Sequence, residues 1–307
     1  MKFVEKSPPR LRPGRSGRGR GQLLLFGGLL GLLCLLALLA PAIAPYDPYA
    51  TQTGNLLAPP SRAHLLGTDE LGRDIASRLL MGLRPSLAAA FCVVALAAVL
   101  GTALGTLGGY LGGPLDGAVR WLITVFQAFP SFLLAVVITG FAGISWRNAC
   151  LALAAVYWAS PARLARSLTL SILEEPYLKS AQMAGCTRWQ LLTRHILPNI
   201  LPQILVNAMG QTGSVIISMS GLSFLGLGAQ RPTCEWGVML AEAQKLLRRA
   251  PQLLLYCSVS LVLLVLICNL FGDALRDRAD RRIAQNEGRP AARKRGGGKH
   301  KKTEETA

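Results

Sequence analysis

Neutral hydrogen-bonding side chains recur within one apolar stretch of the C-terminal third of the chain. Four of them are spaced three or four residues apart, so a helix places them on one face: Asn207, Gln211, Ser214 and Ser218. Such a face can line a path along which a solute makes weak, exchangeable hydrogen bonds. The same groups can instead join neighbouring membrane helices. The sequence leaves a translocation path and helix packing as alternatives.

The chain lacks the side-chain groupings that supply chemical energy or hold a metal ion. The phosphate-binding pattern G-x-x-x-x-G-K-[ST] is absent, because the glycines before Lys299 lack both the upstream glycine and the following Ser or Thr. Seven cysteines form no C-x-x-C pair and the three histidines stand far apart, so we predict no metal site. Acidic residues and histidine are also missing from the middle of the apolar runs, where a proton relay needs them. We therefore expect no enzyme activity and no cofactor bound by this chain.

The composition indicates a membrane protein. The chain has 307 residues, of which 51% are hydrophobic and 16% charged, whereas soluble domains carry about 25% charged residues. The apolar residues form runs of the length that a hydrocarbon core of about 30 Å requires of a helix. We predict an all-α, polytopic membrane protein with six transmembrane helices, at 23–44, 86–107, 121–144, 148–162, 200–224 and 252–272.

The first apolar run has an alternative interpretation. It ends in Ala42-Ile43-Ala44, which resembles the cleavage site of a secretion signal. The run is longer than the usual apolar core of such a signal, and further spans follow it. We predict that it is retained as the first transmembrane helix.

The distribution of lysine and arginine along the chain predicts its orientation in the membrane. They are concentrated in the tails 1–22 and 273–307 and in the segment between the fourth and fifth spans, and the positive-inside rule places these parts in the cytoplasm. The segments 45–85 and 225–251 are then extracytoplasmic loops, and 86–272 forms the membrane core. We expect the basic tails to contact anionic membrane lipid and not nucleic acid.

The cytoplasmic segment 167–199 is too patterned to be a simple tether. Glu174, Glu175 and Pro176 can open a helix, since proline fits the first turn and acidic residues complement the helix dipole. Gly185 allows a sharp bend, and apolar residues beyond it can form a second short helix that ends before Pro198. Two short helices that meet at a glycine make a compact knob, which can fill a groove on another protein and transmit force.

This segment resembles the cytoplasmic coupling loop of ABC importer permeases, E-A-A-x3-G-x9-I-x-L-P. The chain departs from the pattern at three positions, where lysine replaces glutamate, serine replaces the first alanine and histidine replaces isoleucine. The resemblance implies that this loop docks on an ATPase subunit. The residues that match the pattern positions are Lys179, Ser180, Ala181, Gly185, His195, Leu197 and Pro198.

Four tracts narrow the resemblance to the second permease of the dipeptide, oligopeptide and nickel importers, and they cover about residues 22–280. They are the coupling loop, Leu66–Leu79, Phe224–Leu240 and Gly272–Asp277. From the residues themselves, we expect Asp69, Arg73 and Asp74 to form a polar cluster that holds the outer loop against the second span.

The resemblance also implies an assembly in a bacterial inner membrane. Its other parts are a homologous partner permease, two ATP-binding subunits that use ATP and Mg, and an extracytoplasmic solute-binding protein. The solute is nickel or a short peptide. A proton-coupled secondary transporter and a non-transporting membrane scaffold remain as alternative functions.

Overall fold

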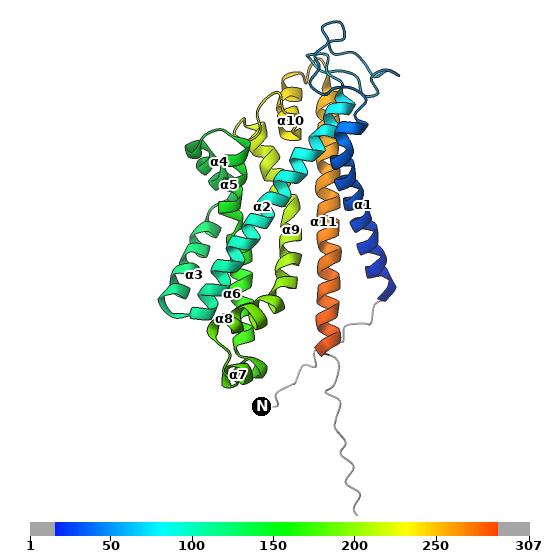
Figure 1. Ribbon diagram of the computed structural model, residues 1–307. Coiled ribbons are helices and arrows are strands. Elements are labelled where there is room, and N and C mark those ends of the chain that lie inside the picture. Colours follow the sequence, from blue (N-terminus) through cyan, green and yellow to red (C-terminus); the bar gives the residue numbers. More distant parts are fainter. Residues whose placement is uncertain (1–15, 288–307) are drawn as a thin grey trace, which may run out of the picture.

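The computed structural model describes residues 16–287, and every regular element in this range is a helix (Figure 1). The all-α prediction is therefore confirmed for the described part of the chain. The elements are α1 (Ser16–Ile43), α2 (Ile75–Leu111), α3 (Gly113–Ala128), α4 (Ser131–Ala142), α5 (Trp146–Tyr157), α6 (Ala159–Leu173), α7 (Pro176–Met183), α8 (Arg188–Gln190), the π-helical turn η1 (Leu191–Ile196), α9 (Leu197–Phe224), α10 (Trp236–Lys245) and α11 (Pro251–Glu287).

Four helical stretches are long and apolar enough to cross a membrane: α1, α2, the continuous stretch from α8 through α9, and α11. A fifth crossing results if α3 and α4 together form one span, although they are bent by 97°. The bend falls at Phe129, whose backbone is extended because Pro130 follows it. The predicted span 148–162 is divided between α5 and α6, which have 12 and 15 residues. The count of six spans therefore stays a prediction.

Two helices extend beyond the predicted transmembrane spans. The second apolar helix begins at Ile75 and not at residue 86, because the Asp74 carboxylate caps it by accepting the Ser77 backbone N–H at 2.8 Å. Counting only charge-free residues shortened this helix, since Arg78 and Arg84 lie inside it. The last helix continues to Glu287, beyond the predicted end at 272, although residues after 272 are charged.

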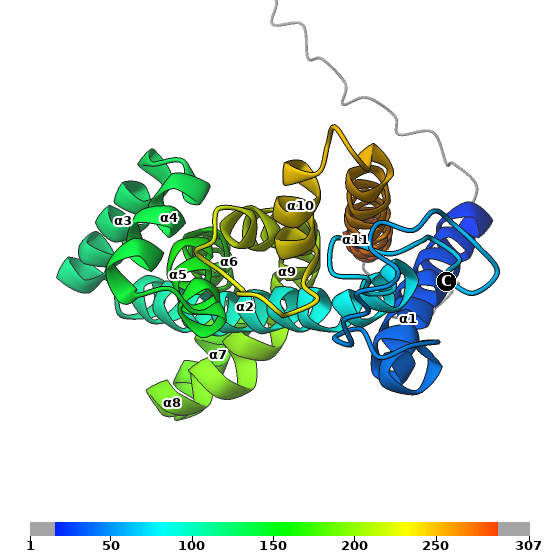
Figure 2. The same ribbon diagram turned by 90° about the horizontal axis from the view of Figure 1, so that it is seen from above.

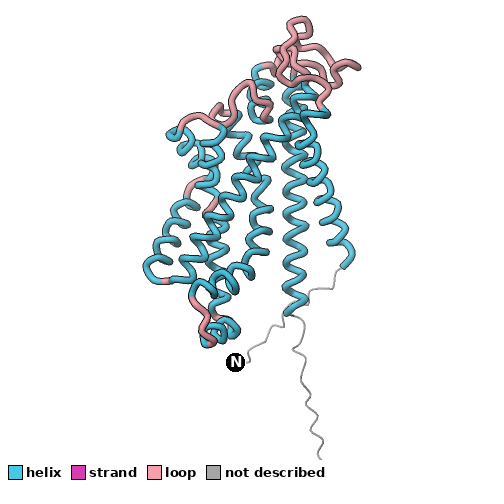
Figure 3. The backbone as a smooth tube through the Cα atoms, in the orientation of Figure 1, coloured by secondary structure: helices cyan, strands magenta, loops and turns pink. Residues whose placement is uncertain are grey.

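Helices α1 and α11 lie side by side on one flank of the bundle, and α3 and α4 lie on the opposite flank (Figures 1 and 2). Between them α2 crosses the bundle obliquely and packs against α6 and α9. The segment α7–α8 lies at one end. The long loop between α1 and α2 lies at the other end, and Figure 3 shows that most of the irregular backbone gathers there.

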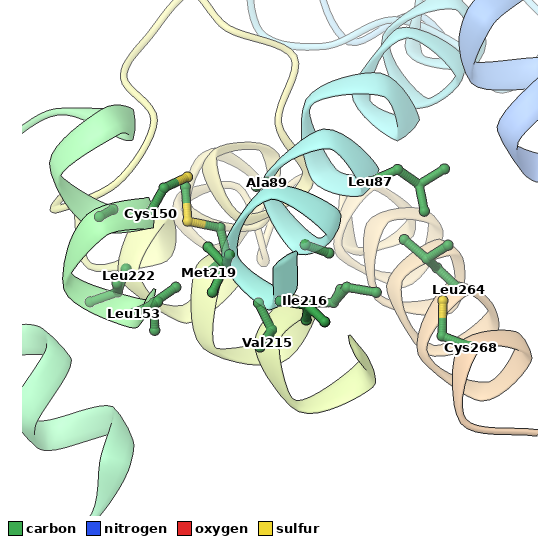
Figure 4. Close-up of a cluster of buried hydrophobic side chains, with 14 of the residues drawn as sticks. Leu87, Ala89, Cys150, Leu153, Val215, Ile216, Met219, Leu222, Leu264 and Cys268 are labelled. Atoms are coloured by element: carbon green, nitrogen blue, oxygen red, sulfur yellow. The ribbon is translucent and has the colours of Figure 1, made fainter. Parts of the chain in front are cut away.

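Close packing of α2 against α6 fixes the centre of the bundle. Gly101 and Gly105 of α2 meet the backbone of Trp158 and Ala162, so a Cβ at either glycine would collide with a carbonyl oxygen. Apolar side chains from α2, α5, α9 and α11 form the largest buried cluster (Figure 4). This packing holds α9, the helix that carries the predicted polar face, among three neighbouring helices.

Candidate functional site

The α7 helix is anchored to the bundle by one buried side chain. It begins at Pro176, after Glu175 with an extended backbone, as the sequence predicts. Leu178 is fully buried among apolar residues that include Leu191 and Ile196 of η1. A second connection is polar, because the Asn199 amide donates to the Tyr177 hydroxyl at 2.8 Å. These two contacts connect α7 to η1 and to the start of α9.

A tight turn at Gly185 follows α7. Its φ is +85°, a conformation that favours glycine, and its N–H donates to the Gln182 carbonyl at 3.0 Å. A capping box then opens α8: the Thr187 side chain accepts the Gln190 N–H, and the Gln190 side chain accepts the Thr187 N–H. The sequence analysis missed this box, although the spacing of Thr187 and Gln190 is its usual signature.

The predicted second short helix does not end before Pro198. Residues of α8 run through η1 into α9 without a loop, and Pro198 lies in the first turn of α9. The Leu197 N–H donates to the Leu192 carbonyl, five residues earlier, so a wider π turn keeps the helix continuous. The part of the knob beyond Gly185 is therefore an extension of α9 and not an independent helix.

The α7–α8 segment exposes large apolar side chains at the end of the bundle. Met183 is 90% exposed and Trp189 is 69% exposed. Of the predicted docking residues, Lys179, Ser180, Gly185 and Pro198 are exposed and Ala181, His195 and Leu197 are partly buried. The matched pattern thus lies at or just beneath the surface that carries these apolar groups.

The four residues of the predicted polar face of α9 have different surroundings in the structure. The Gln211 side chain donates to the side-chain oxygen (Oδ1) of Asn207 at 2.6 Å and to the Ser160 hydroxyl of α6 at 3.3 Å. Ser218 is buried, and its hydroxyl lies 3.0 Å from the Tyr157 hydroxyl of α5. Ser214 is exposed on the surface of α9. Helix packing accounts for Ser218, whereas Asn207 and Gln211 also face open space.

That space is a groove of about 500 Å³ between α6, α9 and α11. Its polar lining combines three side-chain amides of α9 with charged residues of α11, which were predicted from the sequence to belong to a tail. Groups of this kind can bind a small polar solute without holding it tightly. The residues that line it include Leu164, Gln203, Asn207, Gln211, Asp273 and Arg276.

A buried ion-pair network lies at the opposite end of the bundle. Arg73 Nε lies 2.6 Å from Asp69 Oδ2, as the sequence predicts. Both Arg73 and Arg78 also bind Glu242 of α10, at 3.2 and 3.0 Å. The network therefore connects the outer loop and the start of α2 with α10. Arg78 and Glu242 were missed, because their positions are 164 residues apart in the chain and no local pattern joins them.

Asp74 belongs to a separate cluster beside this network. One carboxylate oxygen accepts the backbone and hydroxyl groups of Ser77, and the other lies 3.0 Å from His64 Nδ1. Both His64 and Asp74 are buried. The predicted cluster of Asp69, Arg73 and Asp74 thus becomes two neighbouring clusters, which both hold the outer loop on α2.

Glu235 is the fourth buried acid at this end of the bundle, and no role was predicted for it from the sequence. It caps α10 by accepting the Val238 N–H at 3.1 Å, and it lies 3.4 Å from the Ser220 hydroxyl of α9. Burial raises the pKa of its carboxyl, although the N–H groups of Gly237 and Val238 oppose this shift. Glu235 therefore connects α10 to the outer end of α9. Within residues 16–287 no three side chains of His, Cys, Asp or Glu are grouped to hold a metal ion.

Comparison with known proteins places these features in a family. Residues 99–285 match the family described as binding-protein-dependent transport system inner membrane component. Residues 24–60 match the N-terminal TM domain of oligopeptide transport permease C. The arrangement also resembles the MetNI methionine ABC transporter in inward-facing conformations, with a TM-score of 0.51 and 22% identity, over 70% of this chain and 98% of that chain. That similarity concerns the fold.

Curated relatives agree with the family match. One is the probable D,D-dipeptide transport system permease protein DdpC of Escherichia coli K12, 37% identical over 82% of this chain and 85% of the relative. The nickel transport system permease protein NikC of the same organism is 35% identical over 82% and 91%. The glutathione transport system permease protein GsiD of Pectobacterium atrosepticum is 40% identical over 82% and 84%. This chain therefore belongs to the binding-protein-dependent inner-membrane permeases and is a permease subunit of an ABC importer.

Proposed function

We propose that this chain and a homologous partner permease form the translocation path of an importer for short peptides or nickel. Two separate ATP-binding subunits, using ATP and Mg, supply the energy, and an extracytoplasmic solute-binding protein delivers the solute. This chain contributes no catalytic group. The observation that carries the proposal is the continuity of the exposed α7–α8 segment with α9, which connects a docking surface to a polar groove.

The structure suggests how a docked ATPase subunit moves the path. A force on Met183 and Trp189 reaches the bundle through the buried Leu178, which packs against η1. Because η1 continues directly into α9, the force turns or shifts the helix that carries Asn207 and Gln211. The π turn provides a place where α9 can bend, since such turns often mark hinges. Alternating access then results from two arrangements of packed helices.

The proposed orientation has both termini in the cytoplasm. The first described turn of α1, the last turn of α11 and the α7–α8 segment all lie towards the same end of the bundle (Figure 1). The positive-inside rule assigns that end to the cytoplasm, where the ATPase subunits are. The ion-pair network and α10 are then extracytoplasmic and face the binding protein.

Replacing Gln211 and Ser214 together with leucine is expected to reduce solute uptake about tenfold. The double variant removes the amide from the groove and the hydroxyl from the exposed face of α9, a loss comparable to one or two hydrogen bonds of about 1 kcal/mol each. Uptake into vesicles that contain the assembled complex measures the effect. Thr212→Val is the matched control, because its buried hydroxyl bonds only to the Ala208 carbonyl of its own helix. Unchanged uptake by the double variant would remove this face from the path.

Uptake by the complete complex tests the proposed function. The chain is reconstituted in vesicles with its partner permease, ATPase subunits and binding protein, and entry of radioactive nickel and of a labelled dipeptide is measured with and without vanadate. Vanadate-sensitive uptake of either solute is the expected result. Uptake that ignores vanadate and collapses with the proton gradient would identify a secondary transporter. An assembled complex without solute-dependent ATP hydrolysis would identify a scaffold.

A further inference from the structure

A second groove, of about 520 Å³, lies at the end of the bundle that carries α10. Its walls come from four parts of the chain: the loop after α1, the first half of α2, the start of α5 and the segment between α9 and α10. Most of the lining is apolar, with Met81, Pro85, Trp146 and Ala229 among its members. Grooves of this size, mostly apolar with a few polar groups, are typical of small-molecule sites.

The groove has one charged residue among its described lining, Arg84. Two other arginines lie close to it in sequence, and both are neutralised: Arg73 binds Asp69 and Glu242, and Arg78 binds Glu242. No carboxylate in the described part of the chain lies within the 4.0 Å that defines an ion pair with Arg84. Two of the three neighbouring arginines therefore have acidic partners, whereas Arg84, in the groove, has none among the described residues.

An unpaired arginine in an apolar wall favours a small anion. Arg84 is exposed, so its guanidinium is accessible to a solute, and it presents its donors in a planar fork that matches a carboxylate. Thr233 and Gln230 provide neutral polar groups at the same groove, which suits the amide backbone of a peptide.

We propose that this groove receives the carboxylate of the incoming solute on Arg84, so that the importer carries carboxylate-bearing solutes such as short peptides. The inference rests on the proposed function of the chain as an importer permease. It separates the two solute classes, because an uncompensated cation repels hydrated nickel ion and attracts the C-terminal carboxylate of a peptide. It also places recognition in this chain, in addition to recognition by the binding protein.

A lipid phosphate is the competing source of an anion, since arginine near a helix end can reach the headgroup region. Two features favour the solute. Loop residues of the segment between α9 and α10 close one side of the groove, and Tyr49 of the loop after α1 closes another.

The test compares alanyl-alanine with its C-terminal amide, which lacks the carboxylate. Complete complexes with wild-type chain, Arg84→Gln, Arg84→Lys or Arg248→Gln are placed in vesicles with and without phosphatidylglycerol. The binding protein is present at peptide concentrations that load it with either compound, and vanadate-sensitive uptake is measured. Arg248 is the matched control, because it is an exposed arginine of the loop between α10 and α11 and lies outside the groove.

We expect Arg84→Gln to lower uptake of alanyl-alanine about 10- to 100-fold, the range for loss of one hydrogen bond to a charged group. Uptake of the amide should change less than about twofold, and Arg84→Lys should retain part of the preference for the free acid. Equal losses for both peptides, no loss, or a loss that requires phosphatidylglycerol would each overturn the assignment. A wild-type complex that imports nickel but neither peptide would also overturn it while leaving the permease function intact. Absence of any vanadate-sensitive uptake would instead contradict the permease function.

Discussion

Gly185→Pro is expected to abolish most solute uptake while ATP hydrolysis by the assembled complex continues. Proline cannot adopt the φ of +85° at this position, and it removes the N–H that bonds to Gln182. A distortion that costs about 3 kcal/mol shifts the balance between docked and undocked α7 roughly 100-fold. Uptake and ATP hydrolysis, measured in the same vesicles, give the number of solute molecules carried per ATP.

Gly185→Asn is the matched control for this turn. Asparagine tolerates a positive φ, and no atom lies within 4 Å of the position that its Cβ would take. We therefore expect the asparagine variant to keep most of the wild-type uptake. If the proline variant carried as much solute per ATP as the wild type, α7–α8 would not be the coupling element.

Glu242→Ala is expected to cause the largest loss of stability among single changes at the outer end. The substitution leaves the buried Arg73 and Arg78 with only Asp69 as an acidic partner, and breaking a buried ion-pair network from one side costs about 3–5 kcal/mol. Thermal unfolding of the purified complex and its abundance in the membrane measure the effect. Contacts between α10 and α2 should weaken before the centre of the bundle does.

Glu70→Gln controls for the removal of a nearby acidic charge. Glu70 contacts only the half-exposed Arg231, at 3.5 Å, and a pair of this kind contributes at most about 1 kcal/mol. Its loss should leave the unfolding temperature almost unchanged. Similar destabilisation by both variants would show that the total charge of the outer end matters and not the buried network.

The sequence allowed the family, the helical class and the start of α7 at Pro176 to be predicted, because each depends on local patterns. Apolar runs predicted the helices, and the spacing of Gly185 from Leu197 and Pro198 predicted the segment between α6 and α9. The glycine turn also has a local signal, since its positive φ needs that residue. The detailed boundaries were less predictable: Arg84 limited the charge-free run that begins at residue 86, whereas the helix continues through Arg84 and Arg78 to Ile75.

Other features depend on distant contacts that a sequence does not display. Glu242 meets Arg78 only after α10 folds back on the start of α2. The polar face of α9 could not be divided into packing and groove residues until the positions of Tyr157 and Ser160 were known. Continuity through η1 was missed because Pro198 normally indicates the end of a helix, whereas a π turn allows the helix to continue here.

Photo-crosslinking from position 183 tests most directly whether this permease couples to a separate ATPase subunit through α7–α8. A photoreactive amino acid replaces Met183, which is 90% exposed at the end of α7, or Phe141, which is 91% exposed in α4. Both side chains are apolar and exposed, so the two positions differ mainly in their location on the helical bundle. We predict an adduct with the ATPase subunit from position 183 and not from position 141. An adduct only from position 141, or none from position 183 in an assembled and active complex, would contradict the proposed coupling.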